Sequence, residues 1–513
     1  MNTRPLSPLT PIEPRLRPFL PADLSTAVYT SPTAATFTRV YEHLRTLRRI
    51  LHDYVPRQVS QRPPEPGEVR YEWVEGTLMF TDLAGFTRLT EAHAIRGRAG
   101  AESLLRTLNA YFAGIIEIIS KAGGDLLEFT GDALLVQFSP NPHMNDTLQA
   151  VRAGLRMQRA MQRFAKIETS QGVFSLQMRV GVHRGRFLIA DIGTPLRMEH
   201  VLLGNAVQIA KRAEGAGAVN RVCLTELAVK PVRDCFRFEP GSAGHWLVID
   251  DLTDDQLGEY DLVPPTRRQA TNVLWDRSIP SLVNEITKEV EQTEPLASYL
   301  PASTLRLVVE HTAQRRIVPD FPAATVIFVN LVGMTEMVDR AENGEEAEIV
   351  ASFSLIMALI NAAVEARSGV LKKVTYHLTG SDLMILFGVP GARGDDCIRA
   401  ADAALAVRDV IRGVRELKVG DQVMKLTCQI GMSRGSVFAA EVGEPHGRRE
   451  FNTLGDPVNA AARLMNLAQP DQILLTGAVY SEVNAWFHCE TLGAVSLKGK
   501  TVPIHLFGLV RKK

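Results

Sequence analysis

Apolar residues recur along this 513-residue chain at two spacings, each typical of one kind of secondary structure. Over 104–119 they fall three and four positions apart, which predicts a helix with one buried face. Over 174–182 they occupy every second position, which predicts a half-buried strand. The segment LLEFTGDALLVQF predicts two strands joined by a turn at 130–132, and a second helix is expected over about 146–165. Because helices and strands interleave, the predicted class is α/β or α+β with a central sheet.

The same pattern occurs twice. GTLMFTDLAGFTRLTE at 76–91 is echoed by ATVIFVNLVGMTEMVD at 324–339, and VLLGNAVQIAKR at 201–212 is echoed by TLGDPVNAAARL at 453–464. The offset is 248 residues for the first pair (82 to 330) and 251 for the second (212 to 463). A nearly constant offset of this length is too long for a solenoid repeat and indicates a duplicated domain.

The repeat sets the expected domain boundaries. Six prolines among the first 21 residues predict a disordered or extended arm over 1–34. Apolar positions at helical spacing predict a helical lead-in over 35–70. The first copy is expected over 71–263, an ordered linker with helical pieces over 264–322, and the second copy over 323–513.

Composition narrows the class of protein. The 57 basic and 57 acidic residues cancel, which argues against a nucleic-acid partner. Five scattered cysteines without paired spacing indicate reduced thiols. The first residues lack the apolar core of a secretion signal, and the longest apolar helical stretch, around 355–364, is shorter than a bilayer span. We therefore expect a soluble, cytoplasmic protein without an integral membrane segment.

Two carboxylates of the first copy are candidate metal ligands. Asp82 ends a predicted strand, and Asp132 lies in the predicted hairpin turn. If the two strands are neighbours, both carboxylates project from one edge and can share divalent cations. Two cations about 4 Å apart can activate a hydroxyl and neutralise a phosphate leaving group. Aspartates also suit turns by accepting local backbone N–H groups, and the spacing alone leaves both interpretations open.

The motifs together resemble a known family. TDLAGFT, FTGDALL fifty residues later, and LGDPVNAAARL in the second copy are similar to the class III nucleotide cyclases. The tandem order, and FTDLAGFT paired with FVNLVGMT, most resembles the soluble, bicarbonate-responsive adenylyl cyclases, over about 72–263 and 323–510. The resemblance implies two ferredoxin-like domains that form a pseudo-heterodimer within one chain, expected to be a monomer. It also implies conversion of ATP to 3′,5′-cyclic AMP and pyrophosphate, with two divalent cations, Mg²⁺ or Mn²⁺.

The resemblance assigns half of one shared site to each copy. In the first copy it implies the metal ligands and a phosphate-binding arginine: Asp82, the backbone carbonyl of Leu83, Asp132 and Arg179. In the second copy it implies an adenine-reading lysine (with its neighbour as a one-residue alternative), its partner, the ribose and transition-state residues, and a phosphate-binding lysine: Lys373 (or Lys372), Asn452, Asn459, Arg463 and Lys498. A lysine donor to adenine N1 and an amide acceptor for the 6-amino group favour ATP over GTP. Without the resemblance, the three cations Lys373, Arg463 and Lys498 would also suit a solvated surface.

Losses in the two copies are complementary. The metal and phosphate positions hold Asn330, Ser381 and Gln429 in the second copy. The base and ribose positions hold Glu128, His200 and Gln208 in the first copy, and SLKGK corresponds to the acidic 250–255. Only Arg463 keeps its identity, as Arg212. Random decay would scatter losses over both copies, so this pattern predicts one competent site and one vacant pseudo-site.

Glu128 also bears on regulation. In the bicarbonate-responsive relatives, the resemblance places an anion-binding lysine at this position. A carboxylate repels bicarbonate, so that mode is not expected here, and the pseudo-site stays open to another small-molecule regulator. Two alternative functions remain: an ATP-sensing regulatory protein without turnover, and a guanylate cyclase, which Lys373 disfavours.

Overall fold

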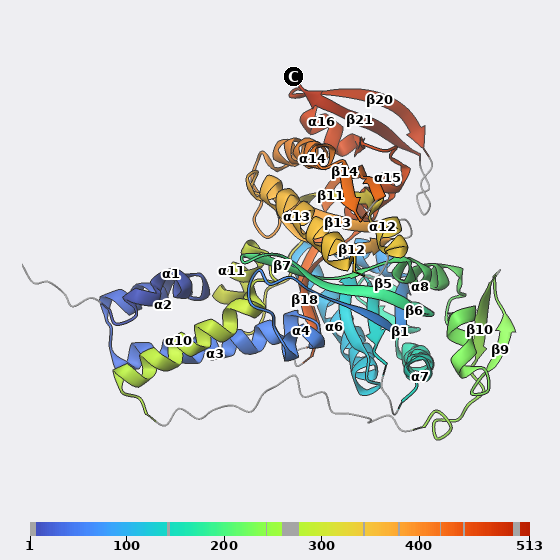
Figure 1. The fold of residues 1–513 in the computed structure, drawn as a ribbon, viewed down its shortest axis with the longest axis horizontal. Coiled ribbons are helices and arrows are strands. Elements are labelled where there is room, and N and C mark those ends of the chain that lie inside the picture. The colour runs from blue at the N-terminus through green and yellow to red at the C-terminus, as the bar shows by residue number, and fades with distance from the viewer. Residues whose placement is uncertain are drawn as a thin grey trace, which may run out of the picture.

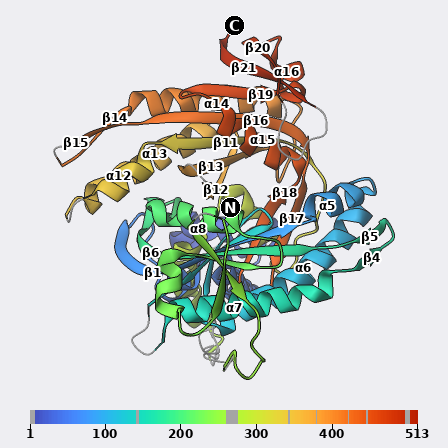
Figure 2. The ribbon, with the colours of Figure 1, turned by 90° about the vertical axis from the view of Figure 1, so that its right-hand side faces the viewer.

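The computed structural model describes residues 7–140, 144–242, 244–258, 276–341, 344–377, 380–420, 422–444, 447–495 and 503–513. Two domains lie one above the other, each built on its own sheet (Figures 1 and 2). The first sheet has the order β2-β3-β1-β6-β8-β10-β9, with β7 also paired to β6, and the second has the order β12-β13-β11-β16-β19-β21-β20. The equivalent strand orders confirm the mixed α/β class and the domain duplication.

The first domain contains most of the elements that the sequence predicts. Its main strands are β1 (Arg70–Ala84), β2 (Asp125–Thr130), β3 (Ala133–Phe138), β6 (Gln177–Thr194), β7 (Arg197–Leu203), β8 (Val222–Thr225), β9 (Arg237–Pro240) and β10 (His245–Ile249). Its helices are α5 (Phe86–Ala94), α6 (Gly97–Lys121), α7 (Asp146–Ala160), α8 (Asn205–Ala216) and α9 (Glu226–Val229), and β4 (Ile167–Thr169) and β5 (Gly172–Phe174) form a small hairpin. The strand predicted over 174–182 begins later, at Gln177, and continues to Thr194.

The second domain repeats this plan. Its main strands are β11 (Ala323–Val332), β12 (Val370–His377), β13 (Gly380–Phe387), β16 (Thr427–Ser436), β17 (Phe438–Gly443), β18 (Arg449–Leu454), β19 (Gln472–Thr476), β20 (Phe487–Val495) and β21 (Ile504–Lys512). Its helices are α12 (Met334–Arg340), α13 (Glu346–Glu365), α14 (Asp396–Gly413), α15 (Asp456–Leu467) and α16 (Gly477–Val483), and β14 (Glu416–Val419) and β15 (Gln422–Lys425) form a hairpin.

Each domain contributes a two-stranded ribbon to the core of the other. In the ribbon β17–β18, the buried side chains of Phe438, Ala440 and Leu454 belong to the core of the first domain, which α6 helps to form. In the second half of β6 and in β7, Leu188 and Val201 belong to the core of the second domain, beneath α13. Because apolar area is buried across the interface in both directions, the two domains are held in one fixed arrangement.

A helical lead-in precedes each domain. The helices α3 (Ala34–Tyr54) and α4 (Arg57–Gln61) precede β1, and α10 (Ile279–Ala297) and α11 (Ala302–Glu310) precede β11. The two long helices pack side by side (Figure 1) and are joined by an ion pair between Arg48 and Glu289, with Nε and Oε2 2.8 Å apart.

The lead-ins also contact the opposite domains in equivalent ways. Tyr54 donates its hydroxyl to Glu441 of the second domain at 3.0 Å, and Tyr299 donates to Asp191 of the first at 2.8 Å. Glu441 stands two residues before Gly443, and Asp191 stands two residues before Gly193. Both glycines lie in the ribbons and have a positive φ. The segment predicted as a linker therefore contains a second copy of the lead-in, and the repeat unit is longer than the catalytic-domain motifs indicate.

The prediction of a disordered arm over 1–34 is wrong for the residues that the structure describes. These residues form short helices that include α1 (Glu13–Leu16) and α2 (Ala22–Thr30). Leu9, Leu16 and Val28 are buried in one cluster with α3 and α10. Prolines occupy the first turns of the short helices, where a missing N–H costs no hydrogen bond. The many prolines of this segment therefore mark a series of helix starts and not a disordered arm.

The apolar helix of the second domain is longer than predicted. α13 spans 20 residues, and by length and composition it is the one helix among the described residues that could cross a membrane. The core helix of a globular domain passes the same test, and the face of α13 that carries Ile349, Phe353 and Ile360 is fully buried in the second domain.

Candidate functional site

The two candidate metal carboxylates lie at one edge of the first sheet, as predicted. Asp82 stands near the end of β1, which pairs with β3, and Asp132 lies in the β2–β3 turn. Gly131 has φ 73°, a left-handed conformation that costs glycine little, and so permits this tight turn. Burial, and then the charge of Asp82, raise the pKa of Asp132 to about 7. The charge of Asp82 therefore disfavours ionisation of Asp132.

This edge offers the donor set of a hard divalent cation. Carboxylate and carbonyl oxygens are the ligands that Mg²⁺ and Mn²⁺ prefer, and a cation would relieve the repulsion between Asp82 and Asp132. Leu83 follows Asp82, and its side chain is buried. No group of three or more His, Cys, Asp or Glu side chains suited to a metal occurs in the described part of the chain. A cation held here would take its remaining ligands from the backbone, substrate and solvent.

Arg179 lies directly opposite Asp82 in the pairing of β1 with β6. Its guanidinium donates to Asp82, and its Nε lies 3.1 Å from Oε1 of Glu214 on α8. Lys211 lies 2.9 Å from the other oxygen of Glu214. The sequence analysis missed Glu214, although its spacing of three residues from Lys211 was an available signal of a pair on one helix face. The four side chains form a chain of alternating charge that holds Arg179 beside the edge that carries Asp82 and Asp132.

The second domain contacts this edge through β18, the strand that precedes α15. Asn459 and Arg463 are four residues apart, so they share one face of this helix, and both are half-buried. Just before the helix, Asn452 is almost fully buried and donates its amide Nδ2 to the carbonyl of Gly131 at 3.1 Å. This contact joins the turn that carries Asp132 to the strand that leads into α15. The Oδ1 of Asn452 accepts the backbone N–H of Thr453 at 2.9 Å, so both ends of the Asn452 amide have protein partners.

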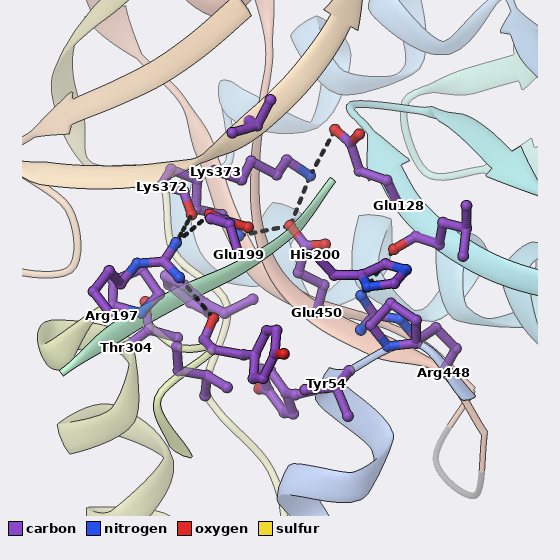
Figure 3. A pocket seen from close by; sticks show the side chains of 18 of the residues that line it. Tyr54, Glu128, Arg197, Glu199, His200, Thr304, Lys372, Lys373, Arg448 and Glu450 are labelled. Atoms are coloured by element: carbon purple, nitrogen blue, oxygen red, sulfur yellow. Dashed lines mark hydrogen bonds and ion pairs between the residues drawn. The ribbon is translucent and has the colours of Figure 1, made fainter. Parts of the chain in front are cut away.

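The predicted base-reading lysine, Lys373, lines a pocket between the two domains (Figure 3). Lys373 Nζ donates to the carbonyl of Phe129, lies 2.8 Å from Oε1 of Glu450, and lies 3.6 Å from Oε1 of Glu128. Lys372 Nζ lies 2.6 Å from the same oxygen of Glu450. Both lysines are buried, so neither is the solvated surface cation of the alternative interpretation.

Strand register confirms one predicted equivalence. Lys373 pairs with Met384 after a bulge in β12, and Glu128 pairs with Leu135 after a bulge in β2. The same register corrects another equivalence. Asn452 stands three residues before Gly455, whereas the residue three before the equivalent left-handed glycine, Gly204, is Val201. The predicted match of Asn452 with His200 is wrong by one position.

In the corrected register, two acids and two arginines that the sequence analysis missed occupy equivalent positions in the two copies. Glu450 corresponds to Glu199, and Arg448 corresponds to Arg197. The signal was present in the sequence as RRE at 448–450 and RME at 197–199. These side chains line one cavity between the domains, together with Glu128, His200, Lys372, Lys373 and the tyrosines of the lead-ins, Tyr54 and Tyr299 (Figure 3). The cavity of about 80 Å³ is too small for a nucleotide.

Three buried ionisable side chains of this cavity have shifted pKa values. Burial raises the pKa of Glu128 to about 7, although Lys373 opposes the shift. Burial would also raise the pKa of Glu450, but Lys372, Lys373 and Arg448 together hold it at about 2. Burial lowers the pKa of Lys372 to about 8. Glu450 is therefore the ionised partner of the lysines, and Glu128 carries a proton for part of the physiological pH range.

This difference predicts a pH-dependent gain in stability for Glu128→Gln. Since the folded state holds the Glu128 proton up to a pKa of about 7 rather than the ordinary 4.5, stability of the parent protein falls as pH rises between these values. A neutral amide avoids that cost. We expect the variant to exceed the parent by up to about 3 kcal/mol in urea unfolding at pH 8, and to show no such gain at pH 4.5. An equal difference at both pH values would contradict the buried-carboxyl interpretation.

At the pseudo-site positions, the side chains bond to neutral partners, and the arginine is exposed. Asn330 donates its amide to Gln429 at 2.8 Å, where the first domain has the ion pair of Asp82 and Arg179. Gln208 donates to Thr335 at 3.3 Å. Arg212 is exposed and donates to Asn205 on its own helix at 2.9 Å. The side chain of Ser381 and the whole of Lys498 lie outside the described residues, so the assignment of Lys498 stays a prediction.

Sequence comparison identifies the class of protein that this fold and site define. Residues 70–246 and 318–509 match the adenylate and guanylate cyclase catalytic domain. Since these segments make up well over half of the chain, the chain belongs to the family that carries this domain.

Individual relatives refine the comparison. Adenylate cyclase type 10 of Oryctolagus cuniculus is 24% identical over 420 residues, which cover 78% of this chain and 24% of that protein. The human type 10 enzyme is 24% identical over 440 residues, which cover 82% of this chain and 25% of that protein. The chain thus spans about a quarter of the length of these relatives. A class III adenylyl cyclase-like ATP-binding protein from Pseudomonas aeruginosa has the same two-domain fold, with a TM-score of 0.54, 14% identity, and coverage of 87% of this chain and 93% of that chain.

Proposed function

We propose that the chain is an adenylate cyclase that converts ATP to 3′,5′-cyclic AMP and pyrophosphate at one site between its two domains. The observation that carries the proposal is the contact from Asn452 to the carbonyl of Gly131. It brings the turn that bears Asp132 against the strand that leads to Asn459 and Arg463. This contact supports a pseudo-heterodimer within one chain, in which groups that the two copies retain separately lie on the two sides of one interface.

Each retained group suits one need of this reaction. The ribose 3′-OH attacks the α-phosphate, so no Ser, Cys or His nucleophile is required. Two divalent cations held by Asp82, the Leu83 carbonyl and Asp132 would lower the pKa of that hydroxyl and offset phosphate charge. Arg179 and Lys498 bind the phosphates, Asn459 orients the ribose, and Arg463 donates to the charge that grows on the α-phosphate.

Base recognition follows from Lys373. Its ammonium donates to adenine N1, which accepts a hydrogen bond, whereas guanine N1 carries a hydrogen. The Asn452 amide oxygen would accept from the 6-amino group only after it releases the N–H of Thr453. We further propose that the protein acts in the cytoplasm as a monomer, without a nucleic-acid partner, and that a small molecule other than bicarbonate regulates it through the pseudo-site.

The test is turnover by the purified chain. With Mn²⁺ and ATP we expect cyclic AMP, formed at least about tenfold faster than cyclic GMP is formed from GTP. Asp82→Ala should abolish the product, whereas Asn330→Ala, at the equivalent position of the pseudo-site, should leave it within about twofold. Tight ATP binding without product would instead favour the ATP-sensing protein, and faster turnover of GTP would favour a guanylate cyclase.

A further inference from the structure

Arg179 is held between two carboxylates of the first domain. Its guanidinium donates from Nη2 to Asp82, and its Nε lies 3.1 Å from Oε1 of Glu214. Glu214 is 2% exposed, and its second oxygen lies 2.9 Å from Nζ of Lys211. One guanidinium therefore joins a proposed metal ligand at the end of β1 to a buried acid on α8.

The contact between Arg179 and Glu214 is close but not aligned. A hydrogen bond requires the N–H to point at its acceptor. Among the described residues, Nε of Arg179 and Oε1 of Glu214 are buried atoms without a hydrogen-bond partner, although 3.1 Å separates them. A buried polar atom left in this way costs free energy. A rotation of the guanidinium that breaks its bond to Asp82 can align the pair, so Glu214 is a second acceptor within reach.

The backbone of Glu214 is fixed against the strand that carries Arg179. Gly181 stands two residues after Arg179 on β6, and a Cβ atom on it would lie 2.0 Å from the backbone N of Glu214. Because Gly181 has no side chain, α8 can lie directly on β6. Lys211 on the same helix remains a partner of Glu214 whichever acceptor the arginine takes.

The whole chain of charges is missing from the second domain. The four equivalent positions there hold neutral residues: Asn330, Gln429, Met465 and Ala462. Met465 is the equivalent of Glu214, because its backbone N would lie 2.3 Å from a Cβ atom on Gly431. The second domain has the same strand order without these charges, so the fold does not require them. The two helix charges are thus retained only in the domain that has the candidate metal ligands.

We propose that Glu214 is a positioning residue that takes over Arg179 when a divalent cation binds Asp82, and so couples cation binding to phosphate binding. The inference rests on the proposed function, because it takes Asp82 as a metal ligand and Arg179 as a phosphate-binding residue. The guanidinium and the cation compete for the same carboxylate. Glu214 lowers the cost of releasing Asp82, since the guanidinium keeps a charged partner. The Nη hydrogens that leave Asp82 can then donate to a phosphate.

The test measures the affinity of the full chain for Mn²⁺ by calorimetry without nucleotide. Glu214→Gln keeps the size of the side chain but removes the charge that competes with Asp82 for Arg179, so we expect Mn²⁺ to bind about tenfold more weakly. Arg179→Met removes the competitor, so Mn²⁺ should bind more tightly than to the parent. Adding Glu214→Gln to Arg179→Met should then change the affinity less than about twofold.

A matched control and a kinetic measurement complete the test. Glu199 is another buried acid that pairs with an arginine, Arg197, and Glu199→Gln should leave the Mn²⁺ affinity within about twofold of the parent. Since Arg179 binds phosphate in the ground state as well as in the transition state, Glu214→Gln should raise KM for ATP about tenfold and change kcat less than about threefold.

Two outcomes would overturn the inference. One is an equal loss of Mn²⁺ affinity from Glu214→Gln in the parent and in Arg179→Met, because the acid would then act on the cation directly. The other is an equal loss in Glu199→Gln. If Asp82→Ala leaves Mn²⁺ binding unchanged, the proposed metal site itself fails, so the two failures are distinguishable. If Glu214→Gln does not fold, Glu214→Asp serves in its place: it withdraws the carboxylate by one methylene, and we expect about threefold weaker binding.

Discussion

Replacing Asp132 by Asn is expected to reduce cyclic AMP formation by about a thousandfold, which corresponds to about 4 kcal/mol of barrier. Asp132 stands in the β2–β3 turn beside Asp82, and the two carboxylates are the proposed metal ligands. An amide keeps the shape of the side chain but loses the charge that would hold a cation. The measurement is single-turnover conversion of ATP with saturating Mn²⁺, compared with the parent chain.

Stability measurements separate this effect from misfolding. Since burial and Asp82 both oppose ionisation of Asp132, the variant without metal should be at least as stable as the parent. Mn²⁺ should raise the melting temperature of the parent, because binding to the folded state alone stabilises it, and should not do so for Asp132→Asn. Retained activity, or an undiminished thermal shift with Mn²⁺, would remove Asp132 from the proposed metal site.

Arg463→Ala is expected to lower kcat about a hundredfold to a thousandfold, the usual cost of removing one donor to transition-state charge. Arg212 provides the matched control, because it occupies the equivalent place on α8 of the other domain. It is exposed and donates to Asn205, and the pseudo-site has the neutral pair of Asn330 and Gln429 where the first domain has Asp82 and Arg179. Arg212→Ala should therefore retain activity within about threefold. Equal losses in the two variants would show that both interfaces take part in the reaction.

Much of the fold was predictable from local pattern. The spacing of apolar residues predicted α6, the β2–β3 hairpin and α7, and the repeat predicted a second domain with the same strand order. Errors arose where one local signal suits two structures. Prolines favour both extended chain and the first turn of a helix, and only burial of Leu16 and Val28 against the lead-in helices decides between them. The second lead-in was not predicted because α3 and α10 have equivalent places in the fold but no common sequence motif.

The candidate site, like the fold, was predicted only in part. The sequence predicted that Asp82 and Asp132 lie at one sheet edge because their motifs adjoin two strands that pair. It did not predict that Asn452 would donate to the carbonyl of Gly131, 321 residues earlier in the chain. The one-residue error at His200 arose because β7 and β18 differ in sequence, and the glycines that begin α8 and α15 correct it.

The amino-acid sequence by itself determined the duplicated α/β architecture, the complementary loss of site groups and the class of chemistry they suit, because these depend on residue identity and local spacing. Only the tertiary structure decided which buried charges meet at the interface. Glu450, Lys373 and Glu128 come from strands far apart in the chain, and their contacts exist because the two ribbons exchange between the domains. Pairing of this kind is set by burial and by the packing of whole domains, so no local pattern encodes it.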